Sequence, residues 1–342
     1  RAMELGADAH YTLKVGDELV ERVVNPMLWG GLAYQGRYPL LCSDRYLIVE
    51  KCIELCDQLG TKTIAHGCTA MGNDQVRFDL SVPPGYEVLA PIRRISETEA
   101  NVRVFEMDDL KARGFVVDET SKRYTVNENV LGVTVSGAEI DQWQEPSPAS
   151  YIWLPPPGQE ASGELRIKFD VQQGVLSANA MSGEALLTHL NETIAPYGVG
   201  RGSYTGDTTI GLKGRIAFEA PGITVMMSVL NSLAAATLSR YQNDFRPVLA
   251  QKWCELVYHG LYSEPLRMDL ELALKQMMQR VTGSVEMVIR AGQSEAVTIE
   301  SPYLLVSGEA SYAQSASWSA VEAEGFVRLY GQGTRLWQEK GQ

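Results

Sequence analysis

The side chains that could do the most chemistry lie close together in residues 65–78, AHGCTAMGNDQVRF. Asn73, Asp74 and Arg77 place an amide, a carboxylate and a guanidinium within about one helical turn. A carboxylate can hold an ammonium group while an arginine grips a carboxylate with two hydrogen bonds, so this set suits a zwitterion. An alternative is open, because Asn73 or Asp74 could instead cap a helix that begins near Gln75. The residue types alone do not choose between the two interpretations.

The elements predicted around this segment place it at the edge of a sheet. An amphipathic helix over residues 44–59 and a short apolar strand over residues 61–65 precede it. The segment therefore begins where a strand of an α/β sheet ends, which is where such sheets bind ligands. Gly67 and Gly72 allow the backbone to approach a ligand closely, and Thr69 offers a hydroxyl.

The segment resembles the signature of the argininosuccinate synthase family, usually written GCTGKGNDQVRFE. Further segments resemble that family in the same order along the chain: GRYPLLCS (36–43), LAPIR (89–93), YTVNEN (124–129), YGVGR (197–201), ELVYHGLYSEP (255–265), VTGSV (281–285), ESPY (300–303) and EGFVRL (324–329). The resemblance covers nearly the whole chain. It implies an α/β fold, in which an adenine nucleotide alpha hydrolase-like (N-type ATP pyrophosphatase) domain with a parallel sheet is joined to an α+β synthetase domain.

The resemblance also predicts the domain organisation. Residues 1–118 would form the nucleotide-binding domain, residues 119–325 the synthetase and multimerisation domain, and residues 326–342 a short C-terminal tail. The chain begins at Arg1, and the family's first strands and its SGGLDTS phosphate-binding loop have no counterpart in it. We expect the natural protein to extend upstream and to carry that loop; a member that has lost the loop is the alternative.

The activity implied by the resemblance is that of an ATP-dependent ligase in arginine biosynthesis. Such an enzyme joins aspartate to citrulline, or to a related ureido compound, through an adenylated intermediate and releases AMP and pyrophosphate. By position, Asp74 would be catalytic, beside the aspartate amine. Three sets of ligand contacts follow from the resemblance: Thr69, Asn73 and Asp74 for aspartate; Tyr38, Ser43, Asn73, Arg77, Thr125 and Thr134 for citrulline or its equivalent; Gly67, Thr69 and Gly72 for ATP. ATP would bring Mg²⁺ as its counter-ion, and no metal site of the protein itself is expected.

Several residues depart from the family pattern. Ala70 and Met71 replace the Gly-Lys pair of the signature, and methionine cannot supply a lysine's charge to a phosphate. Gly206 replaces a glutamate and Phe218 a tyrosine, both of which contact citrulline in the family. These changes fit a pocket reshaped for a different acceptor, although Asp207 could compensate by a shift of one residue. They also leave open a catalytically silent relative that binds a ligand or assembles with a partner.

Composition limits the classes of function. The chain has 342 residues, of which 45% are hydrophobic, and a net charge of −12, which argues against nucleic acid as a general partner. Five cysteines without metal-ligand spacing fit reduced thiols in a cytoplasm. No apolar run approaches the roughly 18 residues of a membrane span, and no signal peptide is visible. We therefore expect a cytoplasmic protein, and the resemblance implies a homo-oligomer, a tetramer.

Periodicity predicts the other elements. Residues 10–15 alternate like a strand, residues 17–29 form a helix with Asp17 as its cap, and the buried face of the helix over 44–59 includes Leu47 and Ile48. Helices are further predicted over 107–113, 183–194, 223–241, 245–261 and 266–280, and strands over 164–171, 175–181, 284–290 and 296–301. Residues 326–331 are predicted to be a last strand or a short turn.

Overall fold

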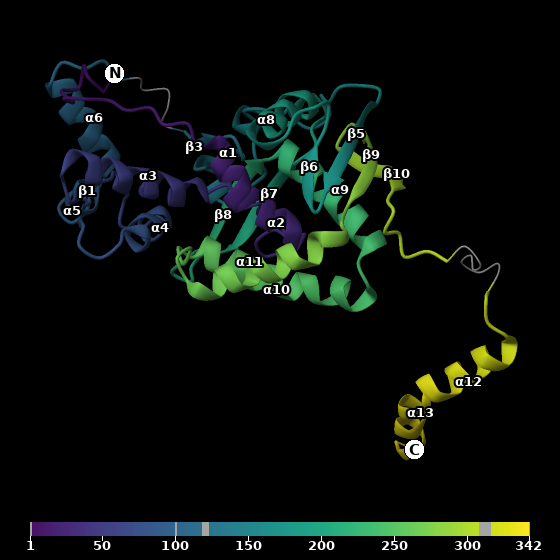
Figure 1. Ribbon diagram of the computed structural model, residues 1–342. Helices are drawn as coiled ribbons and strands as arrows, with labels where there is room; N and C mark the ends of the chain where they lie inside the picture. The colour runs from purple at the N-terminus through teal and green to yellow at the C-terminus, as the bar shows by residue number, and fades with distance from the viewer. Residues whose placement is uncertain (1, 100, 118–122, 308–315, 342) are drawn as a thin grey trace. The chain divides into compact units, whose positions relative to one another are not determined.

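The computed structural model describes residues 2–99, 101–117, 123–307 and 316–341. It divides into two compact units, Arg1–Tyr303 and Leu304–Gln342 (Figure 1). The domain boundary predicted after residue 118 lies outside the described residues, and the boundary predicted after residue 325 stays a prediction.

The segment with the reactive side chains begins at the end of a parallel strand pair. Strand β1 (Thr63–Ala65) pairs in parallel with β2 (Glu87–Leu89), with Ile64 opposite Val88. Helix α3 (Asp44–Leu59) precedes β1, and helix α4 (Asp74–Ser81) lies between the two strands in the chain. Helices α5 (Pro91–Ile95) and α6 (Val102–Ala112) follow. The predicted order of strand, loop and helix is therefore confirmed.

Two antiparallel sheets of four strands each make up the rest of the larger unit's described sheet structure. One has the order β3 (Thr125–Asn129), β4 (Gly132–Ser136), β8 (Lys213–Glu219), β7 (Arg201–Asp207). The other has the order β10 (Gln293–Glu300), β9 (Gly283–Arg290), β5 (Leu165–Gln172), β6 (Val175–Ser177). The chain therefore combines an α/β part with an α+β part, as predicted.

The helices of the second part form a layer that shares one core with the strands. These are α8 (Gly183–Ile194), α9 (Pro221–Thr237), α10 (Arg240–Tyr258) and α11 (Pro265–Met277), and the short α7 (Ala138–Asp141) follows β4. Single turns of 3₁₀-helix lie at Pro148–Ser150, Ala195–Tyr197 and Met278–Arg280. The apolar faces of α8 and α9 are completely buried, and Leu190 and Leu230 are examples.

The first helical stretch of the chain belongs to this same core. It consists of α1 (Gly16–Leu19), a π-helical turn (Val20–Val24) and α2 (Asn25–Gly30), and it packs against α8, α9, α10 and α11 (Figure 1). Asp17 does not cap this stretch as predicted. Its Oδ1 accepts a hydrogen bond of 2.9 Å from the backbone N–H of Glu184, so it satisfies the first turn of α8 instead.

Two other predictions were wrong. Residues 10–15 pair with no strand of the described chain and stay irregular, because alternation alone does not form a strand without a hydrogen-bonded neighbour. Residues 326–331 lie at the end of α12 (Ala320–Tyr330), which α13 (Gln332–Lys340) follows. Ser319 and Glu322 form a reciprocal capping box that starts α12, and this S-x-x-E pattern was the signal that periodicity missed.

No helix of the described residues is both long enough and apolar enough to cross a membrane.

Helix α3 offers a matched test of its packing. Leu47 is completely buried, whereas its neighbour Ile48, predicted to share the buried face, is 41% exposed. We expect Leu47→Ala to lower the free energy of unfolding by about 2 to 5 kcal/mol, because it leaves a cavity. Ile48→Ala should change it by no more than about 0.5 kcal/mol. Urea unfolding of both variants measures the difference, and equal losses would contradict this orientation of α3.

Candidate functional site

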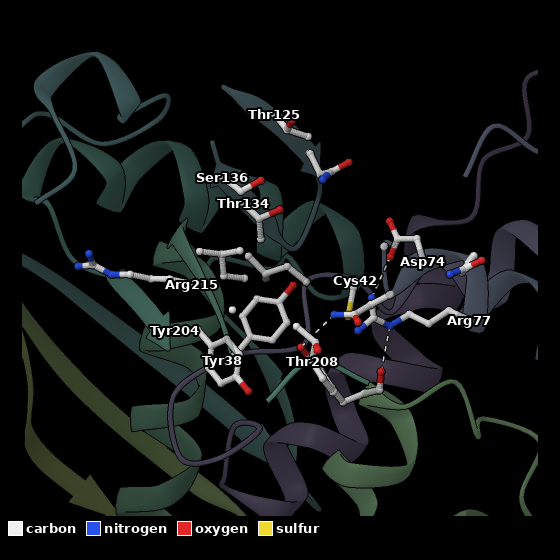
Figure 2. Close-up of a pocket in the computed structure, with 18 of the residues that line it drawn as sticks. Tyr38, Cys42, Asp74, Arg77, Thr125, Thr134, Ser136, Tyr204, Thr208 and Arg215 are labelled. Atoms are coloured by element: carbon white, nitrogen blue, oxygen red, sulfur yellow. Dashed lines mark hydrogen bonds and ion pairs between the residues drawn. The ribbon is translucent and has the colours of Figure 1, made fainter. Parts of the chain in front are cut away.

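A cavity of about 650 Å³ is lined by most of the residues predicted to contact ligands. Its walls are formed by the loop after β1 and the start of α4 on one side, and by β3, β4, β7 and β8 on the other. Figure 2 shows Asp74 and Arg77 on one side of Tyr38, with Thr125 and Thr134 on another. All the predicted contact residues except Ser43 line this cavity: Tyr38, Gly67, Thr69, Gly72, Asn73, Asp74, Arg77, Thr125 and Thr134.

Asp74 lies between two arginines. Its Oδ2 accepts hydrogen bonds from Arg45 Nη2 at 2.9 Å and Nε at 3.2 Å, and its Oδ1 accepts one from Arg77 Nη1 at 2.8 Å. Burial by itself would raise the pKa of this carboxyl, but the two guanidiniums outweigh burial and lower it. Asp74 is therefore a fixed negative charge and a weak base.

Arg77 is held by two of its three guanidinium nitrogens, Nε and Nη1. It is 3% exposed, its Nε donates to the carbonyl oxygen of Tyr258 at 3.0 Å, and its guanidinium carbon lies 4.8 Å from the centre of the Tyr258 ring. Among the hydrogen bonds of the described residues, none uses its second terminal nitrogen, Nη2. Burial opposes the charge on Arg77, but neighbouring groups that include Asp74 raise its pKa. A permanent cation thus lines the cavity and keeps a donor for an anionic ligand.

The structure does not support the capping interpretation of Asn73. Asn73 occupies the N-cap position of α4, yet its side chain makes no capping hydrogen bond. Instead Asn73 Oδ1 accepts from the backbone N–H of Thr209 at 3.0 Å, and its Nδ2 donates to the Tyr258 hydroxyl at 3.3 Å. The amide thus joins the signature loop to the turn between β7 and β8 and does not cap the helix.

Ser43 is the exception among the predicted contacts. It is completely buried at the start of α3, and its hydroxyl donates to the carbonyl oxygen of Leu40 at 2.8 Å. The hydroxyl closes a local turn, and Ser43 is not among the residues that line the cavity.

The glycines of the signature loop have free space beside them. A Cβ added to Gly67 would meet its nearest neighbour at 4.0 Å, and one added to Gly72 would lie 3.6 Å from the Thr69 hydroxyl. His66 supports the loop, because its Nε2 lies 2.7 Å from Asp79 Oδ1 while its Nδ1 accepts the N–H of Cys68 at 3.2 Å. This structural use of His66 leaves the glycine backbone free to approach a ligand.

Sequence reasoning missed other residues of the site. Arg45 pairs with Asp74, while Tyr258 contacts Asn73 and Arg77; Tyr204 and Asn127 also line the cavity. Arg45 could have been found, since a basic residue on the inner side of the predicted helix beside Ser43 needs a carboxylate partner. The tyrosines have no local signal, because the contacts that bring them here span about half of the chain.

Aromatic rings form one side of the cavity. The Tyr34 and Tyr258 rings stack with centroids 3.8 Å apart, and Tyr38 packs edge-on to Phe218 at 5.9 Å. Burial raises the pKa of Tyr258 to about 12, and it raises the pKa of Tyr38 as well. These phenols therefore stay neutral at physiological pH and can both donate and accept hydrogen bonds.

Two domain families match the chain in order. A model described as "Arginosuccinate synthase N-terminal HUP domain" matches residues 1–108, and one described as "Arginosuccinate synthase C-terminal domain" matches residues 124–337. A HUP domain carrying the signature loop, followed by a synthetase domain that completes the cavity, defines an ATP-dependent ligase.

Sequence comparison with curated relatives identifies the family within this class. The chain is 46% identical to the argininosuccinate synthase of Xanthomonas campestris pv. campestris over 99% of its length and 87% of the relative's. It is 44% identical to that of Xylella fastidiosa (98% and 85%) and 30% identical to that of Methanocaldococcus jannaschii (99% and 86%). The chain belongs to the argininosuccinate synthase family.

The charge triad of Asp74, Arg45 and Arg77 can be tested by the pH dependence of the free energy of unfolding. We expect Asp74→Asn to lower the free energy of unfolding by about 1 to 3 kcal/mol at neutral pH, because buried guanidinium donors lose a charged acceptor. The folded-state pKa of Asp74 lies below its ordinary value of 3.8. Its contribution is therefore complete above that value and is lost as the pH falls through the folded-state pKa. Urea unfolding of wild type and variant at a series of pH values measures the difference.

A matched control for this variant is Asp57→Asn. Asp57 pairs with Lys62 on the surface, where its side chain is 55% exposed, so a much smaller change is expected. A loss at Asp74 no larger than the loss at Asp57, or one that persists unchanged in acid, would contradict the triad.

Proposed function

We propose that the chain ligates aspartate to a ureido acceptor of the citrulline type, with ATP converted to AMP and pyrophosphate. One observation carries the proposal: the polar residues of the signature loop and the threonines of the antiparallel sheet line a single cavity. A ligase must hold two reactants and a nucleotide next to one another, and positioning of this kind replaces a bimolecular encounter.

The aspartate end of the cavity is the signature loop. Thr69 offers a hydroxyl without a hydrogen bond to any other described residue, and Asn73 and Asp74 lie beside it. Asp74 is held negative by two guanidiniums, and a carboxylate has about four acceptor sites, so it can still receive an ammonium or amine. Because its pKa is lowered, we assign Asp74 the role of orienting the amine by hydrogen bonding, with removal of the proton left to solvent or to the leaving nucleotide.

The acceptor end lies between Arg77 and the antiparallel sheet. Arg77 keeps a terminal nitrogen for a carboxylate, and Tyr38, Thr125 and Thr134 supply hydroxyls from three different segments. Thr125 and Thr134 lie on the neighbouring strands β3 and β4, where Thr134 is paired with Asn127. Strand pairing therefore fixes the spacing of these hydroxyls.

ATP would lie against the open backbone of Gly67 and Gly72, where backbone N–H groups can approach phosphate oxygens. Met71, which replaces the family's lysine, is 75% exposed and adds no charge there. We propose that Mg²⁺ arrives bound to the nucleotide phosphates. The described residues contain no cluster of His, Cys, Asp or Glu suited to hold a metal ion by itself.

The reaction then has two steps. The ureido oxygen forms a bond to the α-phosphorus of ATP while the bond to the β-phosphate oxygen breaks and pyrophosphate leaves. The aspartate nitrogen next attacks the ureido carbon, loses a proton, and displaces AMP. Adenylation is needed because a ureido carbon is a poor electrophile until its oxygen becomes a good leaving group.

Assembly as a homotetramer in the cytoplasm also belongs to the proposal. The C-terminal unit supports it, because α12 and α13 expose large apolar side chains: Val321, Phe326, Leu329 and Trp337. Size-exclusion chromatography with light scattering measures the subunit number.

The activity itself is tested by pyrophosphate release from ATP. The full-length protein should release pyrophosphate when both aspartate and a ureido acceptor are present, and not when either is omitted. Detectable aspartate binding without release, whichever ureido acceptor is added, would instead favour a catalytically silent relative.

Asp74→Ala should lower kcat/KM by about 10- to 100-fold, because a charged hydrogen-bond acceptor is worth roughly 1.5 to 3 kcal/mol. Asp57→Ala, at the exposed pair with Lys62, should leave kcat/KM unchanged. Circular dichroism checks that each variant is folded. Full activity of folded Asp74→Ala would contradict the role assigned to Asp74.

Thr134→Val should raise KM for the acceptor by about tenfold, because it removes one hydroxyl and keeps the shape of the side chain. Thr134→Ser retains the hydroxyl and should restore KM. Steady-state kinetics with acceptor as the varied substrate separates the two, and an equal KM for both variants would place Thr134 outside the acceptor contacts.

A further inference from the structure

Trp143 lines the 650 Å³ cavity with a side chain that the fold itself does not use. It is 55% exposed, and no hydrogen bond or ring contact among the described residues involves its indole. By contrast, the indole N–H groups of Trp29, Trp153 and Trp253 each donate a hydrogen bond within the protein, at 3.1, 2.7 and 2.8 Å. A large aromatic ring without a partner in the wall of a cavity is available to cover a ligand there.

The backbone of Trp143 has an unfavourable conformation. Its φ is +64°, in the left-handed region that a bulky residue rarely adopts. Ala138, at the start of α7, also has a positive φ, of +44°. Such conformations cost free energy, persist only where neighbouring contacts enforce them, and cluster at ligand sites. No hydrogen bond or ring contact of the Trp143 indole offsets this cost within the described chain.

Contacts on both sides of Trp143 enforce this conformation. The Trp143 N–H donates to the carbonyl oxygen of Ile140 at 3.1 Å, and the Ile140 side chain is completely buried. The carbonyl oxygen of the next residue, Gln144, accepts from Arg215 Nη1 at 2.6 Å. Figure 2 shows the Arg215 side chain extending away from Asp74. The turn is therefore fixed to α7 and to β8, and it presents the indole at a defined place in the cavity wall.

Strand pairing shows which end of the cavity this turn occupies. Arg45 of the charge triad lies 3.4 Å from Asn127 on β3, measured from Nη2 to Oδ1, so Asn127 is near the triad. Thr125 lies two residues along β3 from Asn127, a distance of about 7 Å. It is paired with Ser136, which ends β4 just before α7 and the Trp143 turn. Trp143 is therefore at the end of the cavity remote from the charge triad.

We propose that Trp143 covers the bound reactants at this end of the cavity and keeps water from the adenylated intermediate until aspartate has reacted. This rests on the proposed ligase function. If a water oxygen bonds to the α-phosphorus of the intermediate, the bond from phosphorus to the ureido oxygen breaks. The water loses a proton, and AMP and the unchanged acceptor leave, so ATP is consumed without a carbon–nitrogen bond. An apolar ring excludes water and adds neither a nucleophile nor a base, which is what protection of a reactive intermediate requires.

The test measures how tightly two products are coupled in the full-length protein. Pyrophosphate and the ligated product are quantified in one reaction with ATP, aspartate and citrulline, and wild type should form them in equal amounts. Trp143→Gly should release roughly twofold or more pyrophosphate per ligated product, because water reaches the intermediate. Equal amounts in this variant would overturn the inference and leave the ligase function standing. No pyrophosphate release by wild type, with citrulline or with any other ureido acceptor, would overturn the ligase function and the inference with it.

Further variants separate a cover from a residue that only packs. Trp143→Gly should unfold at a temperature no lower than wild type, because glycine adopts a positive φ freely. Trp143→Phe keeps a ring and should stay coupled. Phe245→Ala removes a ring that is 52% exposed and does not line this cavity, and it should also stay coupled. Arg215→Met should uncouple the products by releasing the turn, and Arg215→Lys, which keeps a donor, should restore coupling. Equal uncoupling by Phe245→Ala and Trp143→Gly would overturn the inference.

Tryptophan fluorescence tests the cover directly, even where Trp143→Gly does not fold. Aspartate, citrulline and a non-hydrolysable ATP analogue are added together to the full-length protein. The emission of wild type should shift to shorter wavelength, because an exposed indole becomes covered, and Trp143→Phe should abolish the shift. A wild type without the shift, or a shift that persists in Trp143→Phe, would overturn the inference.

Discussion

The pairing of Asp74 with Arg45 and Arg77 is the interaction on which the site depends. Arg45 belongs to α3, and Asp74 and Arg77 to α4, so one carboxylate joins the two helices that flank β1. Arg77 continues the connection, because its Nε binds the carbonyl oxygen of Tyr258 at the end of α10. Buried charges must be paired, and here the pairing requirement fixes the position of the loop that carries Thr69 and Asn73.

The same network makes the two parts of the cavity dependent on each other. Asn73 binds the turn after β7 through the N–H of Thr209, and Arg45 Nη2 lies 3.4 Å from Asn127 Oδ1 on β3. The first contact joins the signature loop to the turn between β7 and β8, and the second joins α3 to β3. The position of the loop therefore depends on the position of that sheet.

The sequence predicted the features that depend on residues close together in the chain. It did not predict those that depend on contacts between distant segments. The apolar run at 61–65 and the segment after it predicted a strand, a loop and a helix, and Asn73, Asp74 and Arg77 do line one cavity with Thr125 and Thr134. Periodicity found the helices of the second part but failed for residues 10–15, where the outcome depends on a neighbouring strand. Neither method could place Tyr204 or Tyr258, because their positions follow from packing between distant elements.

The first helical stretch, from Gly16 to Gly30, has a consequence for how the chain becomes folded during synthesis. Its buried side chains, among them Val24 and Leu28, contact a core completed by α8, α9, α10 and α11. A ribosome makes this stretch early and those helices much later. The apolar side chains of this stretch therefore stay exposed to solvent or bound to a chaperone until more than half of the chain has left the ribosome.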